Sequence, residues 1–161
     1  MSVDLPKYFL KPGYIFVSKK PYLLHTVLGS CVSVCFWDEQ LKIASMNHII
    51  YDKPFTKEQD TRFANISIPY MLKLMKDKGC LIENIKADII GGAHNPLFNN
   101  ILVSKNNIEM AEKVLKKYEI RIRGRDVGGE MGRKVIFNTE TGEILIYKVN
   151  KVREDDWYEY H

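Results

Sequence analysis

One cysteine and one histidine are the residues of this chain whose types and spacing could do chemistry. Cys31 follows a Gly-Ser pair, and His48 comes seventeen positions later. A thiolate is a nucleophile, and a neighbouring imidazolium lowers the pKa of a cysteine from about 8.5 towards neutrality. The same imidazole can return its proton to a leaving group, which is general acid catalysis. The pair predicts a cysteine hydrolase if the two side chains meet beside a crevice. The structural alternative, a small apolar core cysteine and an unrelated histidine, stays open.

Two strand-forming segments carry these residues. Segments 31–37 and 41–50 are rich in β-branched, aromatic and other apolar residues, and the polar stretch 38–40 between them is short. A short polar connection between two such runs is typical of a β-hairpin.

The register of this hairpin decides whether the thiol and the imidazole meet. A four-residue turn at 38–41 pairs Trp37 with Lys42, and the same register then places Cys31 directly opposite His48. Facing Cβ atoms in such a pair lie about 4.5–5.5 Å apart. A shift by one residue would send the two side chains to opposite faces of the sheet.

Donors for a developing oxyanion are available on both sides of the pair. Gly29 can adopt a positive φ without steric cost, so the backbone N–H groups near Ser30 and Cys31 could converge on an oxygen. Asn47 is a second candidate donor, although strand alternation points its side chain away from that of His48.

The remaining pattern, in which strands outnumber helices and many strands are adjacent in sequence, predicts an α+β fold in one layered domain of residues 1–161. The helix expected at 61–78 contains Pro69, which either kinks it or marks the start of its regular part. The second helix is expected at 106–118, with Asn106 as its cap and Glu109 three residues later. Strands are expected at 14–17, 22–28, 31–37, 41–50, 85–91, 120–127, 133–138 and 143–149.

Composition is that of an ordinary soluble domain. The 161 residues are 45% hydrophobic and 27% charged, with a net charge of +4. No apolar run approaches the roughly 20 residues that span a bilayer, and the N-terminus has no apolar signal core. The three cysteines show no metal-type spacing with histidine, and they suit the reducing cytoplasm. We therefore expect a cytoplasmic protein with no membrane insertion, no metal site and no cofactor.

Positive charge gathers near the expected second helix. A solvated helix face is the default interpretation of such a run, and a docking surface for an acidic partner is the alternative. Nucleic-acid binding is disfavoured because acidic residues are scattered through the chain. The residues of this run are Lys113, Lys116, Lys117, Arg121, Arg123 and Arg125.

The segment Thr26–Cys35, followed by Met46-Asn47-His48, resembles the signature of CheD-type chemoreceptor glutamine deamidases. The resemblance runs from about residue 8 to about residue 149, in the family's order, and leaves the 150–161 tail unassigned. The further motifs that carry it are Tyr14-Ile15-Phe16-Val17, Phe63-Ala64-Asn65, Ile90-Gly91-Gly92-Ala93, Asn107, Asp126-Val127-Gly128-Gly129 and Asn138-Thr139-Glu140-Thr141-Gly142.

This resemblance implies an activity and roles for residues. Family members hydrolyse glutamine side chains on the cytoplasmic helices of methyl-accepting chemoreceptors, and some are credited with hydrolysis of glutamate methyl esters. Cys31 would be the nucleophile and His48 the general base and acid. The family's third residue is an upstream threonine, for which Thr26 is the nearest match and His25 the competitor. The resemblance also implies the fold: packed mixed β-sheets flanked by two main helices, similar to that of bacterial deamidating cysteine hydrolases.

The resemblance also implies an alternative function. Some family members bind a CheC-type phosphatase and stimulate it, so the chain could be a regulatory binding module with little catalysis of its own. The presence of both Cys31 and His48 favours the hydrolase, because a pure adaptor needs neither residue.

Overall fold

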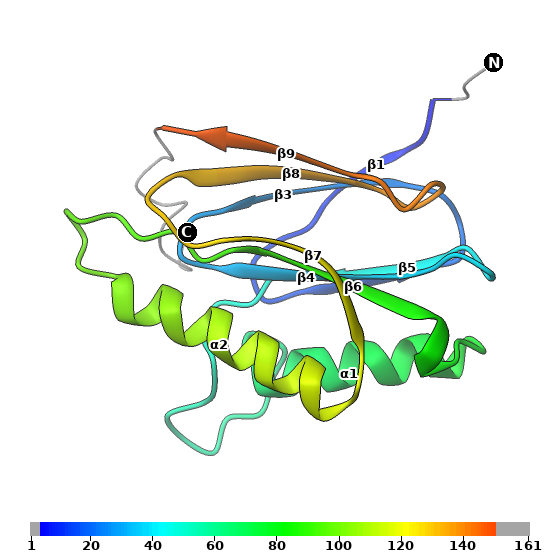
Figure 1. Cartoon of the computed structure of the whole chain (residues 1–161), viewed down its shortest axis with the longest axis horizontal. Coiled ribbons are helices and arrows are strands. Elements are labelled where there is room, and N and C mark those ends of the chain that lie inside the picture. The colour runs from blue at the N-terminus through cyan, green and yellow to red at the C-terminus, as the bar shows by residue number, and fades with distance from the viewer. Residues whose placement is uncertain (1–3, 151–161) are drawn as a thin grey trace.

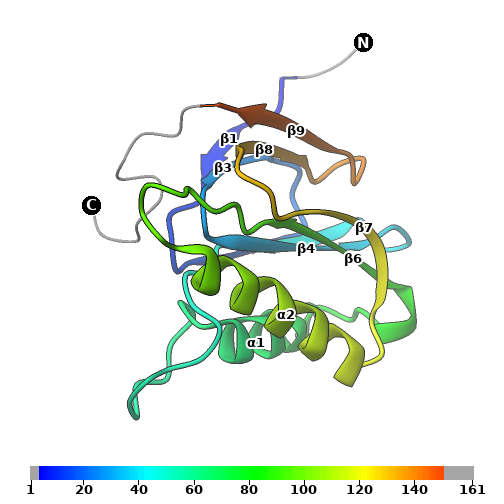
Figure 2. The same ribbon diagram turned by 60° about the vertical axis from the view of Figure 1, so that its left-hand side comes forward.

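Two β-sheets are stacked face to face, and two helices cover the outer face of one of them (Figures 1 and 2). The computed structural model describes residues 4–150. One sheet has four strands in the order β1-β3-β8-β9, and the other has five in the order β2-β5-β4-β6-β7. Helices α1 and α2 lie side by side on the five-stranded sheet. The expected α+β class, with mixed sheets and two main helices, is confirmed.

Along the chain, the first four strands alternate between the two sheets, the next three belong to the five-stranded sheet, and the last two belong to the four-stranded sheet. The elements are β1 (Lys7–Phe9), β2 (Ile15–Ser18), β3 (Leu23–Leu28), β4 (Val32–Asp38), β5 (Ile43–Asn47), α1 (Ala64–Asp77), a short 3-10 turn (Ile82–Asn84), β6 (Ile85–Gly91), α2 (Ile101–Lys117), β7 (Arg121–Val127), β8 (Gly132–Asn138) and β9 (Ile144–Val149).

Strand β4 is the centre of the molecule, and all of its residues are buried. Alternation sends Val34 and Phe36 into the apolar layer beneath the helices. Cys35 and Trp37 enter a second apolar layer, between the two sheets. A strand that is covered on both faces is mostly apolar in sequence, which is why the sequence predicts this strand so clearly.

Both helices begin at other residues than the sequence pattern suggests: α1 begins three residues later than expected, and α2 begins five residues earlier. Helix α1 starts at Ala64, so Pro69 lies inside it and does not mark its beginning. Helix α2 starts at Ile101, and the residue at its N-cap position is Asn100, six residues before the expected cap. The prediction of Asn106 as a cap was wrong, because Asn106 lies inside the helix, whose buried face begins with the polar residues Ser104 and Asn107 before it continues through Ala111.

The predicted register of the β4–β5 hairpin was also wrong. Trp37 pairs with Ala44 and Asp38 with Ile43, which shifts the strands by two residues. The connection closes because Leu41 N–H donates to Asp38 Oδ1 (3.0 Å) and Lys42 adopts a positive φ of 54°. An even shift leaves every side chain on its predicted face, whereas an odd one would not.

Candidate active site

The isolated bridge between Val32 and Ile49 locates Cys31 and His48. Val32 N–H donates to the Ile49 carbonyl (3.1 Å) and Ile49 N–H to the Val32 carbonyl (2.7 Å). Cys31 and His48 each precede one member of this pair, so they are diagonal neighbours and not directly opposed. Diagonal positions lie about 7–8 Å apart, within reach of a ring side chain. Both residues are buried, with exposed fractions of 2% and 3%.

Thr26 connects His48 to the opposite sheet. Its Oγ1 lies 2.7 Å from His48 Nδ1 and donates to the Leu10 carbonyl at 3.0 Å. A hydroxyl has one proton, so when that proton goes to Leu10 the oxygen accepts from Nδ1–H. This contact favours the tautomer with its proton on Nδ1, which leaves the Nε2 lone pair as the base.

His25, the competing candidate, lies on the other face of β3. Its ring is 4.9 Å from the ring of Phe9, on the outer face of the four-stranded sheet. Burial, with Lys7 and Lys134 nearby, holds the pKa of His25 below its ordinary value. Of the two candidates for the third position, Thr26 is therefore the one that contacts His48.

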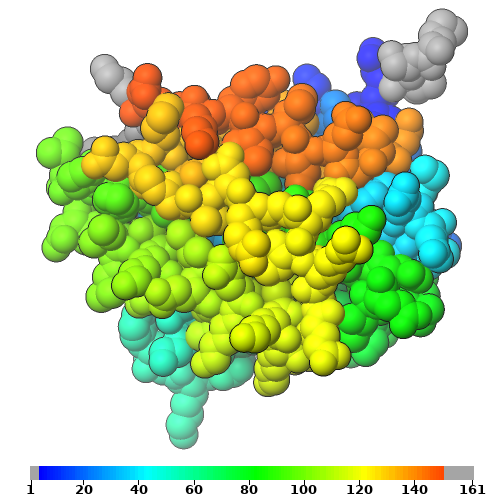
Figure 3. Space-filling model, viewed as in Figure 1, coloured from blue at the N-terminus to red at the C-terminus, as the bar shows by residue number. Residues whose placement is uncertain are grey.

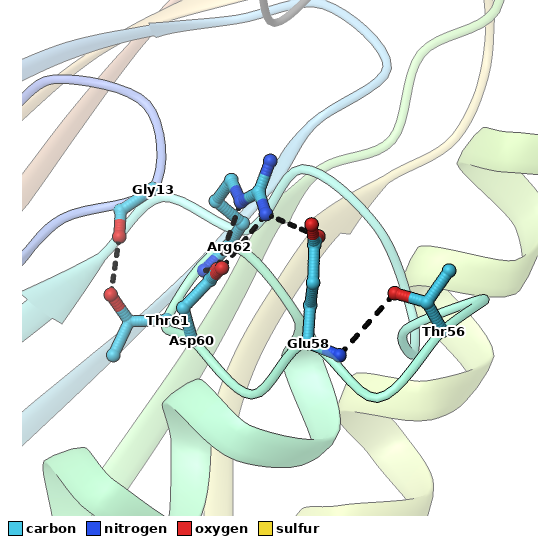
Figure 4. A network of polar contacts seen from close by, with 6 residues as sticks. All are labelled: Gly13, Thr56, Glu58, Asp60, Thr61 and Arg62. Atoms are coloured by element: carbon cyan, nitrogen blue, oxygen red, sulfur yellow. Dashed lines mark hydrogen bonds and ion pairs between the residues drawn. The ribbon is translucent and has the colours of Figure 1, made fainter.

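The backbone of His48 is held from the β2 side of the sheet. Gly13 N–H donates to the His48 carbonyl (2.8 Å), and His48 N–H donates to the Tyr14 carbonyl (3.2 Å). The loop before α1 holds the Gly13–Tyr14 segment in turn (Figure 4). Thr61 Oγ1, on this loop, donates to the Gly13 carbonyl at 2.6 Å. The base is thus held from the β2 side of the sheet as well as through the Val32–Ile49 bridge.

An exposed ion-pair network orders the same loop (Figure 4). Arg62 donates to Asp60 Oδ1 and Oδ2 at 2.9 and 2.8 Å and to Glu58 Oε2 at 2.8 Å. The Arg62 guanidinium holds the pKa of the Asp60 carboxyl below its ordinary value. Exposed pairs of this kind contribute little to stability, so their role is mainly to shape the loop.

A glycine turn after β6 packs against the nucleophile segment. Gly92 N–H donates to the Cys31 carbonyl (2.8 Å) and Ala93 N–H to the Gly29 carbonyl (2.9 Å). Gly91 has φ +110°, and a Cβ placed there would collide with the Cys31 carbonyl oxygen. Only glycine allows this approach, which explains the Gly-Gly pair in physical terms.

Asn47 uses its amide on the helical side of the sheet. Its Oδ1 accepts from Val34 N–H (2.7 Å), and its Nδ2 donates to Ser67 Oγ on α1 (3.0 Å). Ser33 Oγ donates to the Asn47 carbonyl (2.6 Å), so side chains replace ladder bonds between β4 and β5 here. The expectation of Asn47 as an oxyanion donor is not supported, because alternation turns it away from Cys31.

Comparison with known proteins identifies the family. Residues 51–148 match the family model described as CheD chemotactic sensory transduction. The chain belongs to the CheD family. The predicted resemblance is confirmed.

Curated CheD relatives match this chain over most of its length. It is 32% identical to the probable chemoreceptor glutamine deamidase CheD of Sulfurimonas denitrificans over 155 residues, covering 92% of this chain and 98% of that protein. It is 34% identical to the protein of the same name from Methanococcus vannielii over 150 residues, covering 89% and 96%. The probable chemoreceptor glutamine deamidase CheD 2 of Geobacter sulfurreducens is 32% identical over 154 residues, covering 94% and 95%.

The other two cysteines of this CheD-family chain differ from a reactive thiol. Burial is the main cause that raises the pKa of Cys35 well above its ordinary value, with the Asp88 carboxylate adding to it. Burial, with Asp38 nearby, raises the pKa of Cys80 to about 12. Both therefore remain protonated thiols at neutral pH. None of the three cysteines forms a disulfide.

The surface hollow between the sheet edges is separate from Cys31. A groove of about 480 Å³ runs between β7 and β9, and residues including Arg123, Gly142 and Leu145 line it. Figure 3 shows this face, with β7 in yellow below β9 in orange. None of Cys31, His48 and Thr26 lines this groove.

Exposed apolar side chains follow the glycine turn along the chain. Leu97, Ile101 and Leu102 come four, eight and nine residues after Ala93 and are exposed, Leu97 at 88%. Lys116 and Lys117 lie in the last turn of α2, at its other end. Arg123 and Arg125 are partly used in ion pairs with Asp88 (2.8 Å) and Glu112 (3.2 Å).

Neither helix in the described part of the chain is long and apolar enough to cross a membrane. Within residues 4–150, no group of three or more His, Cys, Asp or Glu side chains is arranged to hold a metal ion.

Proposed function

We propose that this chain is a cytoplasmic cysteine hydrolase that deamidates glutamine side chains on the cytoplasmic helices of chemoreceptors. The names of its curated relatives support the substrate. The observation that carries the chemistry is the 2.7 Å contact of Thr26 Oγ1 with His48 Nδ1. It holds the imidazole in the layer between the sheets, which is also the layer that contains Cys31.

In the proposed mechanism, Cys31 is the nucleophile and His48 the base and then the acid. Cys31 gives its proton to His48 Nε2, and the sulfur bonds to the carboxamide carbon as the carbonyl electrons move to oxygen. The oxyanion collapses, the C–N bond breaks, and the imidazolium protonates the leaving nitrogen to give ammonia and a thioester. Water then adds with His48 as base, and the C–S bond breaks to give glutamate and the thiol. Backbone N–H groups near Gly29 and Ser30 would stabilise the oxyanion.

The burial of Cys31 suits a substrate presented at the tip of a long side chain. At 2% exposure, the sulfur offers no room for a bulky reactant, whereas a glutamine carboxamide is narrow and terminal. We propose that Leu97, Ile101 and Leu102 receive the apolar stripe of the substrate helix, since helices commonly dock on such surfaces through residues spaced by one turn.

The test is mass spectrometry of a chemoreceptor cytoplasmic fragment before and after incubation with the protein. Conversion of an amide NH₂ to OH raises the mass of each modified peptide, and ammonia is released in equal amount. The Cys31→Ala variant should abolish both signals while it keeps the wild-type circular dichroism spectrum. Deamidation by Cys31→Ala at the wild-type rate would refute the nucleophile assignment.

The same acyl-enzyme chemistry extends to esters. A methylated receptor fragment supplied to the protein should release methanol through the same thioester, and Cys31→Ala should abolish this release as well. The regulatory alternative, docking to a CheC-type phosphatase, predicts instead that Cys31→Ala retains the full effect on phosphatase activity and that no receptor glutamine changes mass.

A further inference from the structure

Asn107 is a buried side chain that joins the two halves of the site. It lies on α2, is fully buried, and faces the five-stranded sheet together with Ala111 and Leu115. Its Nδ2 donates to the Ser30 carbonyl (3.2 Å) and to the Ile50 carbonyl (2.9 Å). Because both partners are backbone carbonyls, which only accept, the orientation of the amide is determined.

The two carbonyls belong to the segments of the nucleophile and the base. The Ser30 carbonyl is part of the peptide unit that supplies the N–H of Cys31, and Ile50 follows His48 by two residues. The ladder between β4 and β5 is interrupted here, since Cys35↔Met46 is the last pair of the ladder and Val32↔Ile49 is an isolated bridge. The amide of Asn107 therefore bridges the strands where their own pairing is weakest.

The contact also has an electronic consequence. A hydrogen bond to a peptide carbonyl increases the polarisation of the whole amide and strengthens its N–H as a donor. The peptide is planar and trans, so the Ser30 carbonyl and the Cys31 N–H point in opposite directions. With the carbonyl held towards α2, the N–H is directed away from α2, where an oxyanion on an adduct of Cys31 would form.

We infer that Asn107 is a positioning residue, which fixes the Ser30–Cys31 peptide relative to His48 and strengthens its N–H as an oxyanion donor. The inference rests on the proposed function for its substrate, although its effect on Cys31 can be measured without one. Asn107 Oδ1 is buried and accepts no hydrogen bond from the described residues. An apolar side chain would avoid that cost but would take one donor away from each of the two carbonyls, so Asn107 also contributes to stability, and the experiment must separate this contribution from positioning.

The experiment compares Asn107→Leu with Leu115→Ala, a control on the same buried face of the same helix. Asn107→Leu is close in volume and removes both hydrogen bonds. We expect it to fold and to lower kcat by roughly 10- to 100-fold at unchanged KM, because donors at an oxyanion act mainly in the transition state. Leu115→Ala should lower Tm more and, below its own Tm, keep the wild-type kcat.

Alkylation of Cys31 by iodoacetamide across pH gives a readout that needs no receptor. The pH dependence of the alkylation rate of Cys31 should differ from that of the wild type in Asn107→Leu and should be the same as that of the wild type in Leu115→Ala. A wild-type kcat and a wild-type alkylation profile in Asn107→Leu would overturn the inference, as would an equal loss of kcat in Leu115→Ala. If the wild-type protein deamidates no receptor, the proposed function fails, and the alkylation profiles alone decide the role of Asn107.

Discussion

Thr26 Oγ1 and His48 Nδ1 lie 2.7 Å apart although they belong to different sheets. The threonine comes from β3 of the four-stranded sheet, and the histidine directly follows β5 of the five-stranded sheet. The imidazole is thus oriented across the interface between the layers, and its proton position depends on that interface.

Replacement of Thr26 by valine removes the hydroxyl and preserves the shape. We expect kcat to fall by about 10- to 100-fold, because the imidazole loses the partner that orients it. Unfolding free energy should fall by about 1–3 kcal/mol, since the Leu10 carbonyl and His48 Nδ1 lose a buried partner. Steady-state kinetics and urea unfolding measure the two effects. Thr26→Ser is the control and should keep most of the activity; equal losses in both variants would contradict this role.

Selective alkylation tests whether Cys31 is activated. At pH 7, iodoacetamide should modify Cys31 roughly 100-fold faster than Cys80, because a raised thiol pKa leaves almost no thiolate. Burial of Cys31 adds a size dependence, so a bulky aromatic disulfide should react more slowly with it than with the unfolded chain. Peptide mass spectrometry over time provides both rates. Modification of Cys80 as fast as Cys31 would speak against an activated nucleophile.

The raised pKa of Cys80 predicts a loss of stability in alkali. The thiol ionises near pH 8.5 in the unfolded chain and near 12 in the folded protein. The contribution of the Cys80 thiol to the unfolding free energy is therefore fully present below about pH 8.5. It is lost as the pH rises towards 12, because in this range the unfolded chain releases the proton and the folded protein keeps it. The slope for one proton is about 1.4 kcal/mol per pH unit. Between pH 9 and 11, the unfolding free energy of Cys80→Ala, measured with urea, should fall less steeply with pH than that of the wild type, and the slopes should differ by this amount. Equal slopes in the two proteins would refute the prediction.

Gly91 and Gly128 form a matched pair for the glycine turn. Both have positive φ, but only at Gly91 would a Cβ meet the Cys31 carbonyl; at Gly128 the space is open. Gly128→Ala should cost about 1–2 kcal/mol from backbone strain and keep activity. Gly91→Ala should cost about 2–4 kcal/mol and abolish most of the activity, because the nucleophile segment must move. Similar activities in the two variants would show that the close approach is unimportant.

Exposed leucines at opposite ends of β6 test the docking surface. Leu97 lies beyond the Gly91 end and Leu81 before the Ile85 end, with exposed fractions of 88% and 55%. Leu97→Glu should raise KM for a receptor fragment by about 10-fold at unchanged kcat, because losing an apolar anchor weakens docking. Leu81→Glu should change neither parameter, and both variants should unfold within about 0.5 kcal/mol of the wild type. An unchanged KM in Leu97→Glu would exclude this surface.

The strands and the class of the fold could be predicted because their signal is local. Segment 31–37 is apolar except for Ser33, since β4 is covered on both faces, and turn residues bound it. The register of the hairpin could not be predicted, because it depends on the Asp38–Leu41 hydrogen bond and the positive φ of Lys42. The start of α2 was missed because Asn106 resembles a cap and because the first buried residue of the helix, Ser104, is polar.

The candidate site was predictable only in part. Cys31, His48 and Thr26 lie in recognisable motifs. The alternation of side chains along the strands places Cys31 and His48 on the same face of the sheet. The contact of Asn107 with Ser30 joins residues 77 positions apart, and no local pattern reveals such a bond. The same holds for Gly92 and Cys31, whose backbone hydrogen bond depends on the way β6 ends beside β4.

Because β3 provides the hydroxyl and the β4–β5 layer provides the sulfur and the ring, activity reports on the contact between the sheets. The helices lie on the far side of the five-stranded sheet and do not depend directly on that contact. In mild urea, hydrolysis should consequently fade before the helical circular dichroism signal does, as the layers begin to separate.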